Sequence, residues 1–242
     1  MPLMLQAMTQ LPGLVGRLIL AGAAAFATLA GGEVLVAQST AAASDSGMFI
    51  IRHAGDTVAT ERFARTATTL NGTLAIRNAS GTFQTYATVL GPDASVALID
   101  VTVRESPGSG RASEPPTGRV TQRARVIFKE DSAAVDDIRN TGMQTRIFGT
   151  ERGAVPYLNL SFALLEQAVR RSRASTPAAT RVPFFNLGGG QTLDAMVAPL
   201  GTDSLRLAIG SVEFRLRVDA WGRVLGGSIP AQQLVAERVG GR

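Results

Sequence analysis

The only histidine, His53, is the first candidate for catalysis, because imidazole is the side chain that most readily transfers protons near neutral pH. With Asp56 and a distant serine it could form a Ser-His-Asp triad. The sequence has no G-x-S-x-G motif, and its serines lie in predicted loops. It has no cysteine either, so a metal ion would need ligands made of oxygen alone. We interpret His53 as a structural residue at a strand end and predict no catalytic residue, no metal site and no enzyme.

Two pairs of neighbouring carboxylates also fail as catalytic pairs. Asp136 and Asp137 are adjacent on a predicted strand, so their side chains point to opposite faces and cannot share a proton or a metal ion. Glu130 and Asp131 lie in a predicted turn, where acidic residues are common for structural reasons. Neither pair predicts a glycosidase.

Three consecutive glycines, Gly188–Gly190, are the closest approach to a phosphate-binding loop. A P-loop needs Lys and then Ser or Thr, followed by a helix, and here Gln191 begins a predicted strand instead. The glycines are better explained as a hairpin bend. We predict no cofactor.

A short repeat supplies the candidate ligand-binding residues. Segments 155–160 and 182–187 read VPYLNL and VPFFNL, identical at four of six positions, and they flank the predicted helix. Similarity stops on both sides, so an internal duplication is not supported. A functional interpretation places both segments at the mouth of one cavity, lined by Tyr157, Phe162, Leu165, Phe184 and Phe185. The alternative is ordinary core packing, since aromatic residues beside a core helix are usually buried.

The N-terminus has the pattern of a secretory signal. Residues 18–30 form an apolar run preceded by Arg17, and small residues suited to cleavage follow it. A transmembrane helix needs about 20 apolar residues, whereas this run has 13 before Gly31, Gly32 and Glu33. We predict a signal segment with a short flexible start over residues 1–43, and a mature chain beginning near Ala37 to Ala43. The expected location is periplasmic or secreted, and only the signal segment is expected to interact with a membrane.

Composition then limits the mature chain. Without cysteine it can have neither disulfides nor the lipid that a bacterial lipoprotein carries on a cysteine. Of the 24 basic residues only Lys129 is a lysine, and the arginines are scattered among few aromatic residues, so nucleic-acid binding is not predicted. The one dense group, Arg170, Arg171 and Arg173, lies at a predicted helix C-terminus, where the helix dipole favours cations.

Most of the remaining sequence alternates between apolar and polar residues, as strands with one wet face do. The clearest example is segment 212–218, in which the apolar residues Val212, Phe214, Leu216 and Val218 alternate with the charged residues Glu213, Arg215 and Arg217. Turns are predicted at Asn71–Gly72, Ser80–Gly81 and Gly91–Asp93, and a flexible loop over residues 105–118. Short turns make consecutive strands antiparallel. The predicted strands cover residues 48–53, 57–66, 73–77, 82–90, 95–104, 119–128, 133–139, 143–148, 182–187, 193–200, 205–209, 212–218 and 224–229.

One segment has helical spacing instead. Between about residues 156 and 173, Leu158, Phe162, Leu165 and Val169 recur on one face, and Pro156 suits a first helical turn. The predicted fold is a mainly β (α+β) domain over residues 44–242, with about a dozen antiparallel strands in a curved meander or half-barrel around this long helix.

The order of elements, the export signal and the ending D-x-W-G-R-V-L-x-x-x-I-P at 219–230 resemble bacterial periplasmic half-barrel proteins of the LolA/LolB-like type. The resemblance implies an apolar cavity between sheet and helix that holds an acyl chain or a similar ligand, and it transfers no functional residue. Two hypotheses follow. The first is an exported, non-enzymatic binding or carrier domain for an apolar, lipid-like ligand. The second is a structural or accessory envelope module that acts through contact with an envelope protein.

Overall fold

The computed structural model describes residues 45–77, 81–105, 118–139, 141–175 and 180–241, all of which belong to one compact unit. The predicted signal segment lies outside the described residues, as does nearly all of the predicted loop at 105–118. Within the described part, no helix is long and apolar enough to span a membrane.

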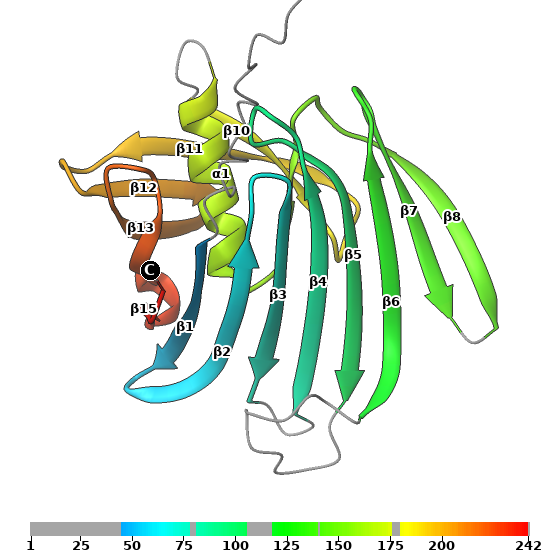
Figure 1. Cartoon of the computed structure of the whole chain (residues 1–242), viewed down its shortest axis with the longest axis horizontal. Coiled ribbons are helices and arrows are strands. Elements are labelled where there is room, and N and C mark those ends of the chain that lie inside the picture. Colours follow the sequence, from blue (N-terminus) through cyan, green and yellow to red (C-terminus); the bar gives the residue numbers. More distant parts are fainter. Residues whose placement is uncertain (1–44, 78–80, 106–117, 140, 176–179, 242) are drawn as a thin grey trace, which may run out of the picture. The chain divides into compact units, whose positions relative to one another are not determined.

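A single sheet of 15 strands dominates the described residues, with strand order β8-β7-β6-β5-β4-β3-β2-β1-β15-β14-β13-β12-β11-β10-β9 (Figure 1). Its first eight strands are β1 (Asp45–His53), β2 (Asp56–Arg65), β3 (Thr69–Ile76), β4 (Thr82–Leu90), β5 (Val96–Glu105), β6 (Arg119–Phe128), β7 (Ser132–Arg139) and β8 (Gly142–Gly149). The others are β9 (Val155–Tyr157), β10 (Arg181–Asn186), β11 (Thr192–Pro199), β12 (Ser204–Ile209), β13 (Val212–Val218), β14 (Val224–Ile229) and β15 (Leu234–Val239).

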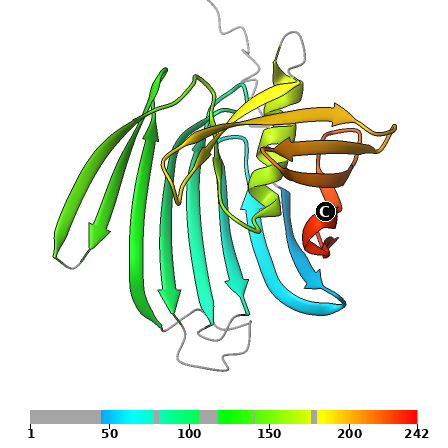
Figure 2. The ribbon, with the colours of Figure 1, turned by 180° about the vertical axis from the view of Figure 1, so that it is seen from behind.

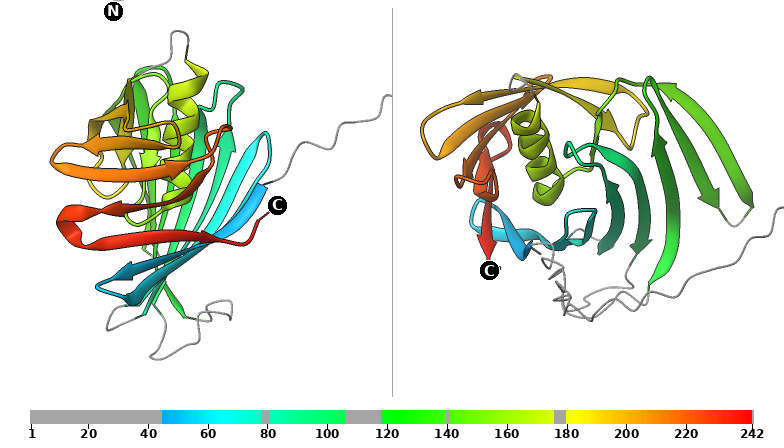
Figure 3. Two further views of the ribbon diagram at one scale, coloured as in Figure 1. Left: turned by 90° about the vertical axis from the view of Figure 1, so that its left-hand side faces the viewer. Right: turned by 45° about the horizontal axis from the view of Figure 1, so that its top comes forward.

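The sheet curls around one helix, α1 (Phe162–Ala174), so that its inner face and the helix share one core (Figure 3). Seen from behind, β10 to β12 run across α1, whereas β6 to β8 splay away from it (Figure 2). The inner face is apolar because alternation puts every second side chain there. In β13, Phe214, Leu216 and Val218 are buried and the arginines between them are exposed, as predicted.

The mainly β prediction is confirmed, but about a dozen strands was too few. The two additional strands are short: β9 has three residues, and β15 follows a turn of 3-10 helix, η1 (Pro230–Gln232). β15 pairs with β1 and thereby joins the end of the domain to its beginning. β9 pairs with β10 and is parallel to it, whereas the other paired neighbours are antiparallel.

The helix exists, but its predicted start at Pro156 was wrong. Pro156 lies in β9, and the helix begins at Phe162 after Ser161. The Ser161 hydroxyl accepts a hydrogen bond from the Leu164 amide at 3.3 Å, which is the usual function of a serine N-cap. Pro is compatible with a helix start and with a short edge strand, so its presence does not separate the two.

The predicted turn at Asn71–Gly72 was also wrong. Both residues lie within β3, and the turn before it is closed by the Thr66 amide, which donates to the Thr69 carbonyl at 2.9 Å. Gly72 lies directly opposite Tyr86 of β4, and a Cβ at Gly72 would overlap the tyrosine ring. The glycine is required by a neighbouring side chain and not by a turn.

Candidate functional site

Four of the five predicted ligand-binding residues are fully buried, and two of the five lie on the helix itself. Phe162 and Leu165 lie on α1, and Phe184 lies on β10. The Phe162 ring packs against Phe49 with centroids 5.6 Å apart, and the partly exposed Tyr157 ring meets Phe184 at 5.9 Å. Tyr157 and Phe184 therefore contact each other, and Phe162, Leu165 and Phe184 belong to the surrounding core.

Phe185, the fifth residue, points to the other side of β10. Its ring lies 5.6 Å from Phe128 and 6.1 Å from Phe148, both in edge-on geometry. These contacts attach β10 to the inner face of β6 and β8. That the five residues line a ligand cavity stays a prediction.

A largely apolar hollow of about 210 Å³ lies elsewhere on α1, beside its C-terminal half. Its apolar walls are Val169 of the helix, Val197 and Pro199 of β11, Leu205 of β12 and Val218 of β13. None of the five predicted residues lines this hollow. It is smaller than the roughly 300 to 1,000 Å³ of a drug-sized site, so it would fit a single short chain or ring.

One exposed cation, Arg173, lines the hollow, and its backbone partners adjoin an exposed aromatic ring. Arg173 lines the hollow, and its Nη1 donates to the carbonyls of Asp219 and Ala220 at 3.3 and 3.1 Å. The next residue, Trp221, is 73% exposed, and the Arg223 guanidinium lies 5.2 Å from its ring centroid. An arginine has five N–H donors, and these two bonds use only one of its nitrogens. Arg173 can therefore bind an acidic group.

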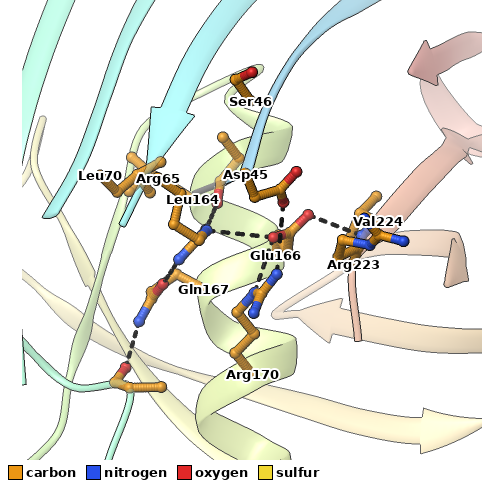
Figure 4. Close-up of polar contacts among 12 residues, drawn as sticks. Asp45, Ser46, Arg65, Leu70, Leu164, Glu166, Gln167, Arg170, Arg223 and Val224 are labelled. Atoms are coloured by element: carbon orange, nitrogen blue, oxygen red, sulfur yellow. Dashed lines mark hydrogen bonds and ion pairs between the residues drawn. The ribbon is translucent and has the colours of Figure 1, made fainter. Parts of the chain in front are cut away.

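A buried charged cluster holds the middle of α1 to the sheet (Figure 4). The Glu166 carboxylate is inaccessible to solvent and accepts hydrogen bonds from Arg170 Nε at 2.9 Å, the Val224 amide at 2.9 Å and Arg238 Nη1 at 3.3 Å. Arg65 Nε lies 3.4 Å from the same carboxylate. One helical carboxylate thus contacts β2, β14 and β15.

Further bonds extend this cluster in two directions. Arg238 Nη2 donates to Asp45 at 2.5 Å, and Arg170 lies 3.7 Å from the same aspartate. On the other side, Arg65 donates to the Gln167 side chain and to the Ala163 carbonyl, the latter at 3.1 Å. Each buried charge has an oppositely charged or hydrogen-bonding neighbour. The cluster therefore attaches the helix to the strands around it.

A second buried carboxylate, Glu61 of β2, caps the start of the helix. It accepts hydrogen bonds from the Tyr86 hydroxyl at 2.7 Å, the Ser161 hydroxyl at 2.5 Å, and the amides of Phe162 and Ala163 at 2.7 and 3.0 Å. Burial raises the pKa of the Glu61 carboxyl above its usual value, and the hydrogen bonds oppose part of that shift. Burial and the neighbouring Glu61 raise the pKa of Tyr86 well above its usual value.

These carboxylates have little capacity for catalysis. Glu61 and Glu166 are both fully buried and their oxygens are engaged, so no substrate reaches them in this conformation. His53 is exposed at the end of β1, as predicted for a strand-end residue. Asp136 accepts from Thr145 on one face of β7, while Asp137 is buried on the other. Among the described residues, no group of three or more His, Cys, Asp or Glu side chains could hold a metal ion.

Neither buried carboxylate was among the residues predicted to be functional. Glu61 follows Ala59 and precedes Phe63 and Arg65 in the alternation of β2, so it occupies a core position. Glu166 follows Leu165 and precedes Ala168 and Val169 on the helix, all of which are buried. The available signal was a charged residue at a position that the alternation assigns to the core, which indicates a buried polar network.

Comparison with known proteins supports the architecture and does not assign a family. No protein-family model matches the sequence, and no curated protein matches it. Among solved structures, a DUF1089 family protein from Pseudomonas aeruginosa is similar, with a TM-score of 0.50 and 13% identity, over 73% of this chain and 91% of that one. A β-barrel-like protein of the domain of unknown function DUF1849 from Brucella abortus has a TM-score of 0.47 and 8% identity, over 82% and 96% of the two chains. The first of these structures shows a related fold. Neither structure is described as a LolA/LolB-type carrier.

Proposed function

We propose that the chain is an exported, non-enzymatic binding domain for a small amphiphile, and that it works in the periplasm or outside the cell. The observation that carries the proposal is the apolar hollow beside α1 with Arg173 at its mouth. An apolar chain would enter between Val169, Val197 and Leu205. An acidic head group would meet the guanidinium.

Two features of the hollow support this ligand class. Apolar walls stabilise a bound chain by removing it from water, at roughly 0.8 kcal/mol per buried CH₂ group. A carboxylate or phosphate at the mouth would gain charge-assisted hydrogen bonds from Arg173, which are stronger than neutral ones. In the described part of the chain, the recorded hydrogen-bond partners of Arg173 are two neutral carbonyl oxygens. An acidic ligand would add a negatively charged partner.

The only tryptophan provides a direct readout of binding. Trp221 adjoins the residues that hold Arg173, so a chain entering the hollow should change its fluorescence. We expect octanoic acid to shift Trp221 emission in a saturable way. Octanol, which has the same chain without the charge, should bind more weakly.

Three variants separate the hollow from nonspecific association. Arg173→Gln should weaken the binding of octanoic acid roughly ten- to a hundredfold and leave octanol nearly unchanged, because one charge-assisted contact is worth about 1.5 to 3 kcal/mol. Val197→Phe should fill the hollow and weaken both probes. Val235→Phe, at a valine that is 53% exposed on β15, is the matched control and should bind as the wild type does. If Val197→Phe stays folded by circular dichroism and binds both probes normally, the proposed site is wrong.

Export is tested separately, by sequencing the N-terminus of the protein after expression. We expect N-terminal sequencing of protein recovered from the periplasm or the medium to begin between residues 37 and 43. Recovery of an intact N-terminus in the cytoplasm would contradict export, whatever the binding experiment shows.

A second function, an accessory module acting through protein contact, is favoured by one observation. The sheet ends on one side in β8, a strand whose first six residues are exposed. Such an edge can pair with another chain.

A further inference from the structure

The two outer strands of the sheet differ in how well they are protected. β9 is three residues long, contains Pro156 and is largely buried. β8 is eight residues long, contains neither Pro nor Lys, and is exposed over Gly142–Ile147. Natural sheets usually protect an exposed edge by short length, proline, charged side chains or a covering segment. Over its first six residues, the described structure of β8 has one charged side chain, Arg146, and none of the other three features.

The register of β8 shows which backbone groups face outward. The Thr150 amide donates to the Asp131 carbonyl at 2.9 Å, one position beyond the Ser132–Gly149 pair. In an antiparallel pair the direction of bonding alternates along the strand, so the even-numbered residues of β8 bond to β7. Met143, Thr145 and Ile147 therefore turn their N–H and C=O groups away from the sheet. Consistent with this direction, the odd-numbered Gly149 accepts the Thr192 hydroxyl with its carbonyl at 3.4 Å.

The side chains of the same residues form an apolar margin. Met143 is 65% exposed and Ile147 is 75% exposed. Register places Ile138 beside Met143, and Ala134 and then Ile127 beside Ile147. The outer face of β6 to β8 thus carries apolar side chains up to the free edge, where they end without a neighbour among the described residues.

We propose that β8 pairs with β8 of a second copy of this chain, antiparallel, about a two-fold axis through Thr145. In this register Thr145 faces Thr145 of the partner subunit, and Met143 faces Ile147 of the partner subunit. Each of these pairs joins residues with outward-facing backbone groups, so each can exchange two hydrogen bonds. The two exposed apolar side chains cover each other twice, once on each side of the axis.

The same register explains why a second copy fits this edge. A two-fold interface must be self-complementary, and the spacing of Met143 and Ile147 around Thr145 is symmetric. On the inner face Gln144 meets Arg146 of the partner subunit, which pairs a cation with a neutral amide. A shift of one residue would turn every side chain to the opposite face and bring exposed apolar groups against polar ones.

The interface is small. One strand edge from each subunit buries less than the roughly 1,200 to 2,000 Å² of a typical stable interface. We therefore expect a weak dimer whose population rises with protein concentration.

Sedimentation of the purified chain tests association. The weight-average mass of the wild type should rise toward twice the monomer mass as concentration rises. Thr145→Pro removes an outward N–H and leaves the backbone bonds to β7 in place, although the side-chain bond from Thr145 to Asp136 is lost as well. Ile147→Lys keeps that bond and places a charge in the contact. Both variants should stay monomeric. Val235→Lys, an exposed valine within the sheet, is the matched control and should dimerise like the wild type. A wild type that stays monomeric at its highest soluble concentration overturns the proposal.

Cysteine cross-linking tests the register, and the absence of natural cysteines removes any background. In Thr145→Cys the two Cα atoms would lie about 5.5 Å apart, within disulfide range. In Met143→Cys they would lie roughly 14 Å apart, too far to bridge. We expect oxidation to join Thr145→Cys subunits, and to join Met143→Cys with Ile147→Cys in a mixture, while Met143→Cys alone stays uncoupled. Equal cross-linking of all single variants, or none of Thr145→Cys, overturns the register.

Discussion

At the scale of single residues, the least expected feature is a carboxylate in the core. Glu61 lies between apolar residues of β2 and is tolerated because two hydroxyls and two backbone amides surround it. Two of these donors are the free N–H groups of the first turn of α1, which every helix leaves without an internal partner. Gly72 is part of the same arrangement, since a larger residue there would displace the Tyr86 ring.

Replacing this carboxylate tests its raised pKa. Because the folded-state pKa lies above the usual 4.5, the folded state binds the proton more tightly than the unfolded chain does. The tighter binding of this proton stabilises the folded state fully below about pH 4.5, and the stabilisation is lost as pH rises through the folded-state pKa. We expect the free energy of unfolding of the wild type, relative to Glu61→Gln, to fall as pH rises above about 4.5. Urea unfolding of both proteins at a series of pH values measures this difference in the free energy of unfolding.

Glu151→Gln is the control with the opposite sign. Arg181 holds the pKa of Glu151 below its usual value, so its contribution is present above about 4.5 and is lost as pH falls further. If the difference between wild type and Glu61→Gln does not change with pH, the assignment of a raised pKa to Glu61 is contradicted.

At the scale of elements, α1 is attached to the sheet by charge as well as by apolar packing. Glu166 contacts strands from both halves of the sequence, β2 on one side and β14 and β15 on the other. A buried ion cluster of this kind contributes little net free energy compared with an apolar substitute, but removing one partner leaves the others buried without compensation.

We expect Glu166→Ala to lower the free energy of unfolding by about 3 to 5 kcal/mol. Urea unfolding monitored by far-ultraviolet circular dichroism measures the loss. Glu213→Ala is the matched control: Glu213 also meets two arginines, Arg206 at 3.8 Å and Arg215 at 2.9 Å, but on the exposed face of the sheet. Glu213→Ala should lower the free energy of unfolding by only about 0 to 1 kcal/mol. Equal losses in the two variants would show that the buried position of Glu166 is unimportant.

At the scale of the whole molecule, the pairing of β1 with β15 makes the sheet continuous. Without this pairing, β1 to β8 and β9 to β15 would be two separate sheets, each with one more free edge. Arg238 of β15 also donates to Glu166 and Asp45, so the last strand completes the charged cluster as well.

A chain ending at Gln232, without β15, should therefore lose its cooperative unfolding transition and aggregate through the exposed edges of β1 and β14. Thermal unfolding and light scattering measure both effects. A chain ending at Val239 keeps β15 and should behave as the full chain does, and Arg238→Ala isolates the contribution of the lost cation. An unchanged midpoint in the chain ending at Gln232 would show that the two parts of the sheet are independent.

Much of this architecture was predictable because alternation is local. Phe214, Leu216 and Val218 identify one face of β13 without any knowledge of its neighbours, and the spacing of Phe162, Leu165 and Val169 identifies a helix. The predictions failed where the deciding partner is distant in sequence. Gly72 was taken for a turn because the reason for the glycine, Tyr86, lies on another strand, and the helix start was misplaced because Ser161 and Pro156 are both acceptable locally.

The sequence by itself determined the β-rich class, the presence of one amphipathic helix, the absence of disulfides and the lack of a two-histidine or cysteine-based site, since these depend on residue type and short-range periodicity. Only the tertiary structure decided that β15 closes onto β1, that Glu61 and Glu166 attach the helix, and that β8 is left as a free edge. These features depend on which distant strands pair, and pairing is fixed by the burial of the whole inner face, a property that no short segment contains.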